Sequence, residues 1–251
     1  MITIKTPTQI RGVKKSSQLA ALTLKYASTL IKPGITTGQI DRLVHRFILD
    51  HQAIPAPLNY LGFPKSICTS INEVVCHGIP SFKTKLKPDD IVNIDITTIL
   101  NGFYGDTSAT FPVGKIPHQA QLLLARTKKA LSLAISVVKP GVPLNLIGQT
   151  IESYVKTFNY APVRQLGGHG IGLEFHEDPF VYHFDTGSND IVLRQGMIFT
   201  IEPMINASPK WQVKIDSKDG WTVRTLDSAL SAQFEHTVLV TPTGSQILTK
   251  I

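Results

Sequence analysis

Two aspartates on a predicted β-hairpin are the first residues in the sequence that could do chemistry. Asn101-Gly102 separates two β-rich runs, and this pair favours a two-residue turn with positive φ at both positions. Counting back from the turn pairs Thr97 with Asp106. Because side chains alternate along a strand, Asp95 shares a face with Thr97 and becomes a diagonal neighbour of Asp106, with ~7 to 8 Å between the backbones. Like charges so placed are unfavourable unless one is protonated or a cation lies between them, so we expect a metal.

The second half of the chain offers two more acids. Glu202 lies on the strand-like run Ile198–Met204, and Glu235 lies on a predicted strand over Ala232–Val240. Strand alternation places Thr200 and Glu202 on one face, and it places Glu235 on the opposite face from His236, which we expect to be structural. Glu202 alone is ambiguous, since a residue before proline can simply end a strand.

A glycine-rich segment, Gly167–Gly172, contains His169, and glycines let the backbone pass close to a site while the imidazole projects into it. Four carboxylates and one imidazole suit Mn, Fe, Co or Zn in an octahedral-like two-metal site better than a structural zinc. Two ions ~3.5 to 4 Å apart, bridged by water, would yield hydroxide near neutral pH.

Other candidate residues could be either structural residues or part of the site. His77 and His176 could be ordinary loop histidines or site residues. Cys68 and Cys76 are expected to be small buried side chains, with no basic partner that would make a nucleophile. Four aromatic residues belong to the core by default, although their loop-like positions also suit a pocket: Tyr60, Phe63, Phe175 and Trp221.

An internal repeat positions these residues. Ile31–Ile35 reads Ile-Lys-Pro-Gly-Ile and Val138–Val142 reads Val-Lys-Pro-Gly-Val, and each is followed by an amphipathic helical pattern. The offset that carries Ile31 onto Val138 also carries Asp95 onto Glu202. We expect helices at about 8–31, 37–52, 118–138 and 144–158, with strands after each pair, which is an α+β arrangement. No linker composition separates the halves, so we expect one domain.

Composition sets the outer limits. The chain has 251 residues, 42% hydrophobic and 17% charged, which excludes disordered, collagen-like and coiled-coil classes. No apolar run approaches the ~20 residues of a membrane span, and no signal peptide is readable. Two cysteines suit a reducing compartment, so we expect a cytoplasmic location. The formal charge of +7 favours polyanions, but its lysine clusters lack interleaved aromatics, so a specific RNA-reading site is not expected.

Six strings in this order resemble type I methionine aminopeptidase in its bacterial form: Ser70–Pro80, Asn93–Asp95, Gly105–Ser108, Gly168–Gly172, Phe199–Met204 and Gln233–Thr237. The resemblance covers essentially the whole chain. It implies the pita-bread (creatinase/aminopeptidase) fold, a single catalytic domain over 1–251 whose pseudo-symmetric halves, about 1–115 and 116–251, each hold two helices and an antiparallel sheet.

The implied activity is metal-dependent removal of the N-terminal initiator methionine from nascent proteins when the second residue is small. A bridging hydroxide would attack the scissile carbonyl at a dinuclear site of Co, Mn, Fe or Zn ions. His77 would contact the peptide nitrogen, His176 the carbonyl, and Glu202 would also shuttle the proton. The resemblance assigns the metal ligands as Asp95, Asp106, His169, Glu202 and Glu235, with Asp106 and Glu235 bridging.

The resemblance also implies binding sites around the metals. Pro57 and Leu61 stand where some relatives carry Cys and His, so the pocket rim is expected to differ from theirs. A monovalent cation is implied near Asn72, Val74 and Ser231. The methionine pocket would be lined by Tyr60, Phe63, Cys68, His77, Phe175 and Trp221.

Two alternatives remain. Prolidase or aminopeptidase P would share the five ligands, although Cys76–Pro80 resembles methionine aminopeptidase rather than either. A catalytically dead pita-bread binding protein would be expected to lose ligands, and this chain keeps all five. The expected partners are nascent polypeptides with N-terminal Met and, transiently, the ribosome through the basic surface. We expect a monomer with no membrane contact.

Overall fold

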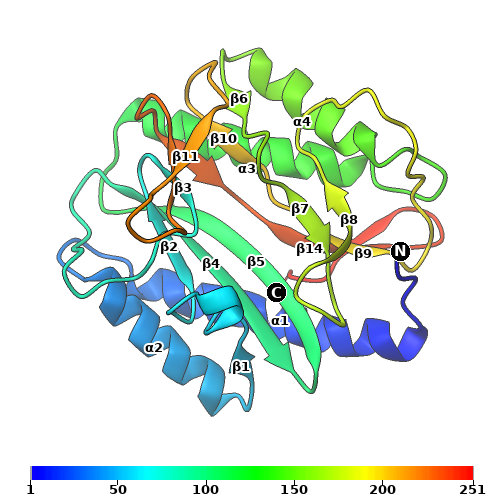
Figure 1. Cartoon of the computed structure of the whole chain (residues 1–251), viewed down its shortest axis with the longest axis horizontal. Helices are drawn as coiled ribbons and strands as arrows, with labels where there is room; N and C mark the ends of the chain where they lie inside the picture. Colours follow the sequence, from blue (N-terminus) through cyan, green and yellow to red (C-terminus); the bar gives the residue numbers. More distant parts are fainter. Residues whose placement is uncertain (1, 251) are drawn as a thin grey trace.

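The computed structural model describes residues 2–250, and each half of the chain begins with two helices and continues into strands (Figure 1). The first half contains α1 (Pro7–Leu30), α2 (Thr37–Asp50), β1 (Ile54–Pro55), the 3-10 turn η1 (Tyr60–Gly62), β2 (Cys68–Ile71), β3 (Val74–Cys76), β4 (Ile91–Leu100) and β5 (Phe103–Pro112). The second half contains α3 (His118–Ser136), α4 (Asn145–Lys156), β6 (Ala161–Pro162), β7 (Gly168–Gly170), β8 (Glu177–Val181), β9 (Ile198–Ile201), β10 (Met204–Asn206), β11 (Val213–Ile215), β12 (Val223–Thr225), β13 (Ser231–Gln233), β14 (His236–Val240) and β15 (Ser245–Ile247).

The expected helices are confirmed, with only small differences at their ends. A capping box at Thr36 and Gln39 starts α2: the Gln39 amide N–H donates to Thr36 Oγ1, and the Thr36 amide N–H donates to the Gln39 side chain. A second capping box, at Thr6 and Gln9, starts α1. The starts of α1 and α2 are therefore encoded locally.

The internal repeat is visible in the backbone conformation. Gly34 and Gly141 both adopt positive φ, +90° and +86°, which the shared Pro-Gly sequence favours. The Gly34 amide donates to the Leu86 carbonyl at 2.8 Å, and the Gly141 amide donates to the Leu193 carbonyl at 2.9 Å. Leu86 and Leu193 are themselves related by the repeat offset, so the repeat extends from the helix connections to the segments that precede β4 and β9.

The β4–β5 hairpin forms with the predicted register. Asn101 and Gly102 take φ values of +53° and +80°, and Thr97 pairs with Asp106 across the two strands. Helix α1 lies directly against this hairpin: a Cβ added at Gly105 would come within 2.3 Å of the Ser17 amide nitrogen. The glycine is therefore needed for close approach of helix and strand.

Two predicted strands are interrupted, which corrects the sequence-based expectation. The run Ile198–Met204 divides into β9 and β10 at Glu202-Pro203, because proline cannot donate a ladder hydrogen bond. The strand expected over Ala232–Val240 divides into β13, which pairs with β10, and β14, which pairs with β9. At this division Phe234 bridges to Ala109 of β5. The chain thus crosses from one sheet to another beside Glu235.

Each half has its own apolar core. One cluster packs α1 and α2 onto β4 and includes Ile40, Ile48 and Ile94. The other packs α3 and α4 onto β9 and β14 and includes Ile151 and Phe199. In Figure 1 the two helix pairs lie on opposite sides of the strands, α1 and α2 below and α3 and α4 above. Among residues 2–250, no helix is long and apolar enough to cross a membrane.

Candidate metal centre

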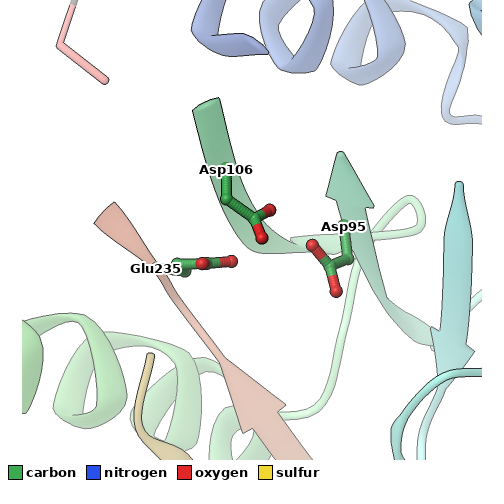
Figure 2. A group of neighbouring side chains, drawn as sticks. All are labelled: Asp95, Asp106 and Glu235. Carbon is green, nitrogen blue, oxygen red and sulfur yellow. The ribbon is translucent and has the colours of Figure 1, made fainter. Parts of the chain in front are cut away.

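Three carboxylates converge where the two halves meet. Asp95 comes from β4, Asp106 from β5, and Glu235 from the break between β13 and β14. One oxygen from each lies within 4.8 Å of the others. Figure 2 shows the three side chains pointing toward one another. The diagonal pairing expected for the two aspartates thus brings their side chains together, and the second half of the chain adds a third.

His169 and Glu202 complete the group from the second half. The Nε2 atom of His169 lies 3.7 Å from Glu202 Oε1 and 3.9 Å from Asp106 Oδ2. His169 lies in β7, and Glu202 follows β9, the neighbouring strand of the same sheet. The structure therefore brings all five predicted ligands into one cluster.

Threonine and glutamine side chains orient two of the acids. Thr97 donates from Oγ1 to Asp106 Oδ1 at 2.8 Å. Thr200 donates to Glu202 Oε1 at 2.8 Å, and Gln233 donates from Nε2 to Glu202 Oε2 at 3.0 Å. Charged acceptors make stronger hydrogen bonds than neutral ones, so these contacts fix the carboxylate orientations.

The acids are held in an environment that opposes their ionisation. Burial raises the pKa of Asp95 to about 7. Burial and the neighbouring Asp95 raise the pKa of Glu202 to about 8. Burial, followed by the charges of the adjacent acids, raises the pKa of Asp106 and of Glu235 well above the usual range. A divalent cation would remove this penalty, because it stabilises the ionised form of each carboxylate.

The His169 ring is held as a neutral ligand with one nitrogen free. Its Nδ1–H donates to the Gly170 carbonyl at 3.0 Å, since a carbonyl oxygen can only accept. Burial lowers the pKa of His169 to about 4, so the ring is neutral at pH 7. The lone pair on Nε2 therefore faces the carboxylates, which is the arrangement that metal-ligating histidines use.

One orphaned atom tests whether these residues fit a metal. Glu235 is 2% exposed, and its Oε1 atom has no hydrogen-bond partner. A buried carboxylate oxygen without a partner is costly, whereas a bound cation would satisfy it. The donor set of carboxylate oxygens and one imidazole nitrogen also suits divalent first-row transition metals. The residues present fit a metal centre.

The cluster forms the floor of a cavity of about 710 Å³. Every residue that the sequence analysis named as a divalent-metal ligand, a catalytic residue or a methionine-pocket residue lines this cavity, as do the pocket-rim residues Pro57 and Leu61. The three residues named for a monovalent cation, Asn72, Val74 and Ser231, do not line it. Besides the five candidate ligands and the two rim residues, the residues that were predicted for the site and line the cavity are Tyr60, Phe63, Cys68, His77, Phe175, His176 and Trp221. The aromatic residues thus lie at the cavity, although Phe63 is also almost fully buried.

His176 is held on the cavity wall by an aromatic contact network. The Tyr60 hydroxyl lies 2.9 Å from His176 Nδ1, and the rings of His169 and His176 are 4.2 Å apart. Phe175 packs against Tyr60 with ring centroids 4.8 Å apart. Burial lowers the pKa of His176 to about 3, so the ring is neutral at pH 7.

His77, from the first half of the chain, also lines the cavity. Its ring centroid is 6.1 Å from that of Trp221, which also packs edge-on against Phe63 at 5.2 Å. Burial lowers the pKa of His77. His77 and His176, which the sequence left open as loop or site residues, therefore both line the cavity as neutral rings.

Three other expectations concern residues beside the centre. His236 points away from it, with Nδ1 2.8 Å from Thr249 Oγ1, as the strand alternation predicted. Both cysteines are free and buried, and burial raises the pKa of each thiol well above 9. The Asn72 carbonyl accepts the Ser231 amide N–H at 2.9 Å, so two of the three residues named for a monovalent cation are in contact.

His183 is a supporting residue that the sequence reasoning missed. Its ring is 1% exposed, and its Nε2 accepts the Glu202 backbone N–H at 3.2 Å. Burial lowers its pKa to about 3. A lone histidine in the segment before β9 carries no motif, so nothing in the sequence pointed to it.

Comparisons with known proteins agree with this geometry. Residues 11–242 match metallopeptidase family M24. The methionine aminopeptidase of Escherichia coli K12 is 49% identical over 249 residues, covering 99% of this chain and 94% of that protein. The crystal structure of methionine aminopeptidase from Rickettsia prowazekii covers 100% of both chains at 48% identity, with a TM-score of 0.97.

A more distant structure shares the fold alone. The prolidase from Pyrococcus horikoshii is 22% identical, covers 98% of this chain and 63% of its own, and gives a TM-score of 0.77. The expected pita-bread fold is therefore confirmed, as is the resemblance to bacterial methionine aminopeptidases. The chain belongs to metallopeptidase family M24.

Proposed function

We propose that this protein is a metal-dependent methionine aminopeptidase that removes the N-terminal methionine from nascent polypeptides whose second residue is small. The observation that carries the proposal is the buried cluster of four carboxylates and one neutral imidazole at the floor of a cavity with aromatic walls. The 49% identity to the Escherichia coli methionine aminopeptidase supports the choice of substrate.

Five residues would hold two divalent ions: Asp95, Asp106, His169, Glu202 and Glu235. Co, Mn, Fe and Zn all suit this mixture of oxygen and nitrogen donors. Bound there, the ions would supply a hydroxide nucleophile near neutral pH and polarise the substrate carbonyl. The resemblance to bacterial methionine aminopeptidases is the reason for proposing that Asp106 and Glu235 would be shared by the two ions, and both carboxylates belong to the three-acid cluster.

The chain's own residues bind the substrate and move protons. His176, neutral and oriented by the Tyr60 hydroxyl, would donate a hydrogen bond to the scissile carbonyl. His77, which also lines the cavity, would contact the peptide nitrogen. Glu202 would take the proton from the nucleophile and pass it to the leaving amine.

The cavity walls suit a methionine side chain. Aromatic rings make favourable contacts with a thioether sulfur, and five Phe, Tyr or Trp rings line the cavity. The Cys68 thiol stays protonated at neutral pH because burial raises its pKa, so it is a small apolar contact. The residues that would bind the methionine are Tyr60, Phe63, Cys68, His77, Phe175 and Trp221.

The remaining proposals concern partners, location and assembly. Exposed lysines, among them Lys15, Lys128, Lys210 and Lys218, support a transient contact with the ribosome through the formal charge of +7. We infer a cytoplasmic monomer, working as one domain because ligands from both halves form the centre. A monovalent cation near Asn72, Val74 and Ser231 remains part of the proposal.

Release of methionine from the peptide Met-Gly-Met-Met tests the function. Metal-stripped protein is resupplied with Mn, Fe or Co and compared with Glu202→Gln, which keeps the shape of the side chain but cannot carry the proton. We expect metal-dependent release that the variant loses almost entirely. Folded wild-type protein that releases no methionine with any metal, or that cleaves Ala-Pro instead, would refute the proposal.

A further inference from the structure

A buried ion pair connects the N-terminal segment to the loop that carries Phe175 and His176. Lys5 Nζ contacts Glu177 Oε2, although the two residues are 172 positions apart. The Lys5 side chain is 1% exposed and the Glu177 side chain is 10% exposed. Lysine is almost never fully buried unless it is paired, so this contact needs an explanation.

The Glu177 carboxylate is also the point at which the loop closes on itself. Its Oε1 atom accepts the Leu173 amide N–H at 2.7 Å and the Glu174 amide N–H at 3.1 Å. The other oxygen receives the Lys5 ammonium. A buried carboxylate with two backbone donors and one cation is well satisfied, whereas the same carboxylate without the cation is an unpaired buried charge.

Lys5 is itself fixed in place. Its amide donates to the Gly196 carbonyl at 2.9 Å, and the next residue, Thr6, is the N-cap of α1. Its hydrocarbon stem passes beside Gly172, where an added Cβ would lie 3.1 Å from Lys5 Cε. The ammonium therefore reaches the loop from a rigid base.

The loop so held presents two groups to the cavity. His176 comes directly before Glu177, and its ring packs 4.2 Å from that of His169. Phe175 packs against the ring of Tyr60 at 4.8 Å. A displacement of Glu177 would move both rings relative to the metal centre, and misplacement by ~1 Å can cost about 100-fold in rate.

We propose that Lys5 is a positioning residue for substrate binding: its ammonium neutralises Glu177 and thereby fixes the 172–177 loop, with Phe175 and His176, against the cavity. This role rests on the proposed aminopeptidase function. Lys5 does not line the cavity, so it acts through Glu177 rather than by touching the substrate.

The test compares Lys5→Met, Glu177→Gln and the double variant, with Lys15→Met as the control, since Lys15 is an exposed lysine on α1. We expect Lys5→Met to lower kcat/KM for Met-Gly-Met-Met at least about tenfold, mainly through kcat, because His176 would contact the carbonyl. The Mn affinity, measured by calorimetry, should change less than about twofold. In the Glu177→Gln background the same substitution should cost under about threefold, because no unpaired carboxylate is left.

Hydrogen exchange supplies a readout that does not depend on activity. Amides 172–177 should exchange faster in Lys5→Met, while those of α3 should not. If the wild type releases no methionine, the aminopeptidase proposal fails and exchange alone decides the role of Lys5. Unchanged exchange in this loop, kcat/KM within twofold of the control, or equal losses in both backgrounds would overturn the inference. If Lys5→Met does not fold, Glu177→Gln is judged by the same exchange and kcat criteria.

Discussion

The metal-free form of this protein should become less stable as the pH rises from 7 to 8. The cause is the set of buried acids whose folded pKa values are raised. A folded acid with a raised pKa keeps a proton that the unfolded chain has already lost. The stability that this proton contributes is therefore lost as the pH rises from the pKa of the acid in the unfolded chain, ~4.3 for Glu, to its pKa in the folded protein.

Glu202 alone gives a lower limit for this loss of stability. With a folded pKa of about 8, raising the pH from 7 to 8 removes about 1 kcal/mol from the free energy of unfolding. Asp106 and Glu235, whose pKa values are raised well above the usual range, act in the same direction. The total is then at least about 1 kcal/mol, a measurable part of the roughly 5–15 kcal/mol that is typical of a folded protein.

Between pH 7 and 8 the pH dependence of stability comes mainly from the buried acids. The buried histidines, such as His169 and His183, have lowered folded pKa values, so they cost stability when the pH falls below their unfolded value of ~6.5 and contribute little above pH 7. The cysteine thiols begin to oppose stability only above their unfolded value of ~8.5.

Urea unfolding followed by tryptophan fluorescence measures the effect in metal-stripped and Mn-loaded protein at pH 7.0, 7.5 and 8.0. We expect the stripped protein to lose stability over this range. The loaded protein should not, because metal binding keeps the acids ionised and displaces their protons. Glu202→Gln should reduce the slope of the stripped protein by about 1 kcal/mol per pH unit. A flat or rising curve for the stripped wild type would show that these acids are not held protonated and would refute the reasoning.

Three further predictions follow from single contacts. Thr200→Val removes the hydroxyl between the His169 amide and Glu202, so Mn affinity measured by calorimetry should fall about 10- to 100-fold, and unchanged affinity would contradict this. Gly105→Ala would force a Cβ to within 2.3 Å of the α1 backbone and should cost about 1–3 kcal/mol in urea unfolding, whereas the control Gly244→Ala, with no atom within 4 Å, should stay within about 0.5 kcal/mol. Iodoacetamide at pH 8 should leave both cysteines unmodified in folded protein and alkylate both in urea, as measured by intact mass; modification of the folded form at a similar rate would mean that they are not buried.

Local sequence determined much of the site because local rules act over short distances. The Asn101-Gly102 turn fixed the register that makes Asp95 and Asp106 neighbours, since strand alternation has a period of two. The repeat linked Asp95 to Glu202 and predicted two similar halves. Side-chain alternation also excluded His236 from the centre, and the structure places it against Thr249.

Tertiary structure decided what depends on contacts between distant segments. The division between β13 and β14 follows from pairing with two different neighbours, which is not encoded within Ala232–Val240 itself. The contacts of His183 with Glu202 and of Lys5 with Glu177 join residues that are separated in the chain and share no motif. Hydrogen bonds and ion pairs of this kind depend on position in space, so periodicity and turn chemistry cannot reveal them. The sequence, through its motifs and the resemblance they carry, therefore predicted the groups that are proposed to bind metal and substrate, while the packing of the two halves selected the residues that hold those groups in place.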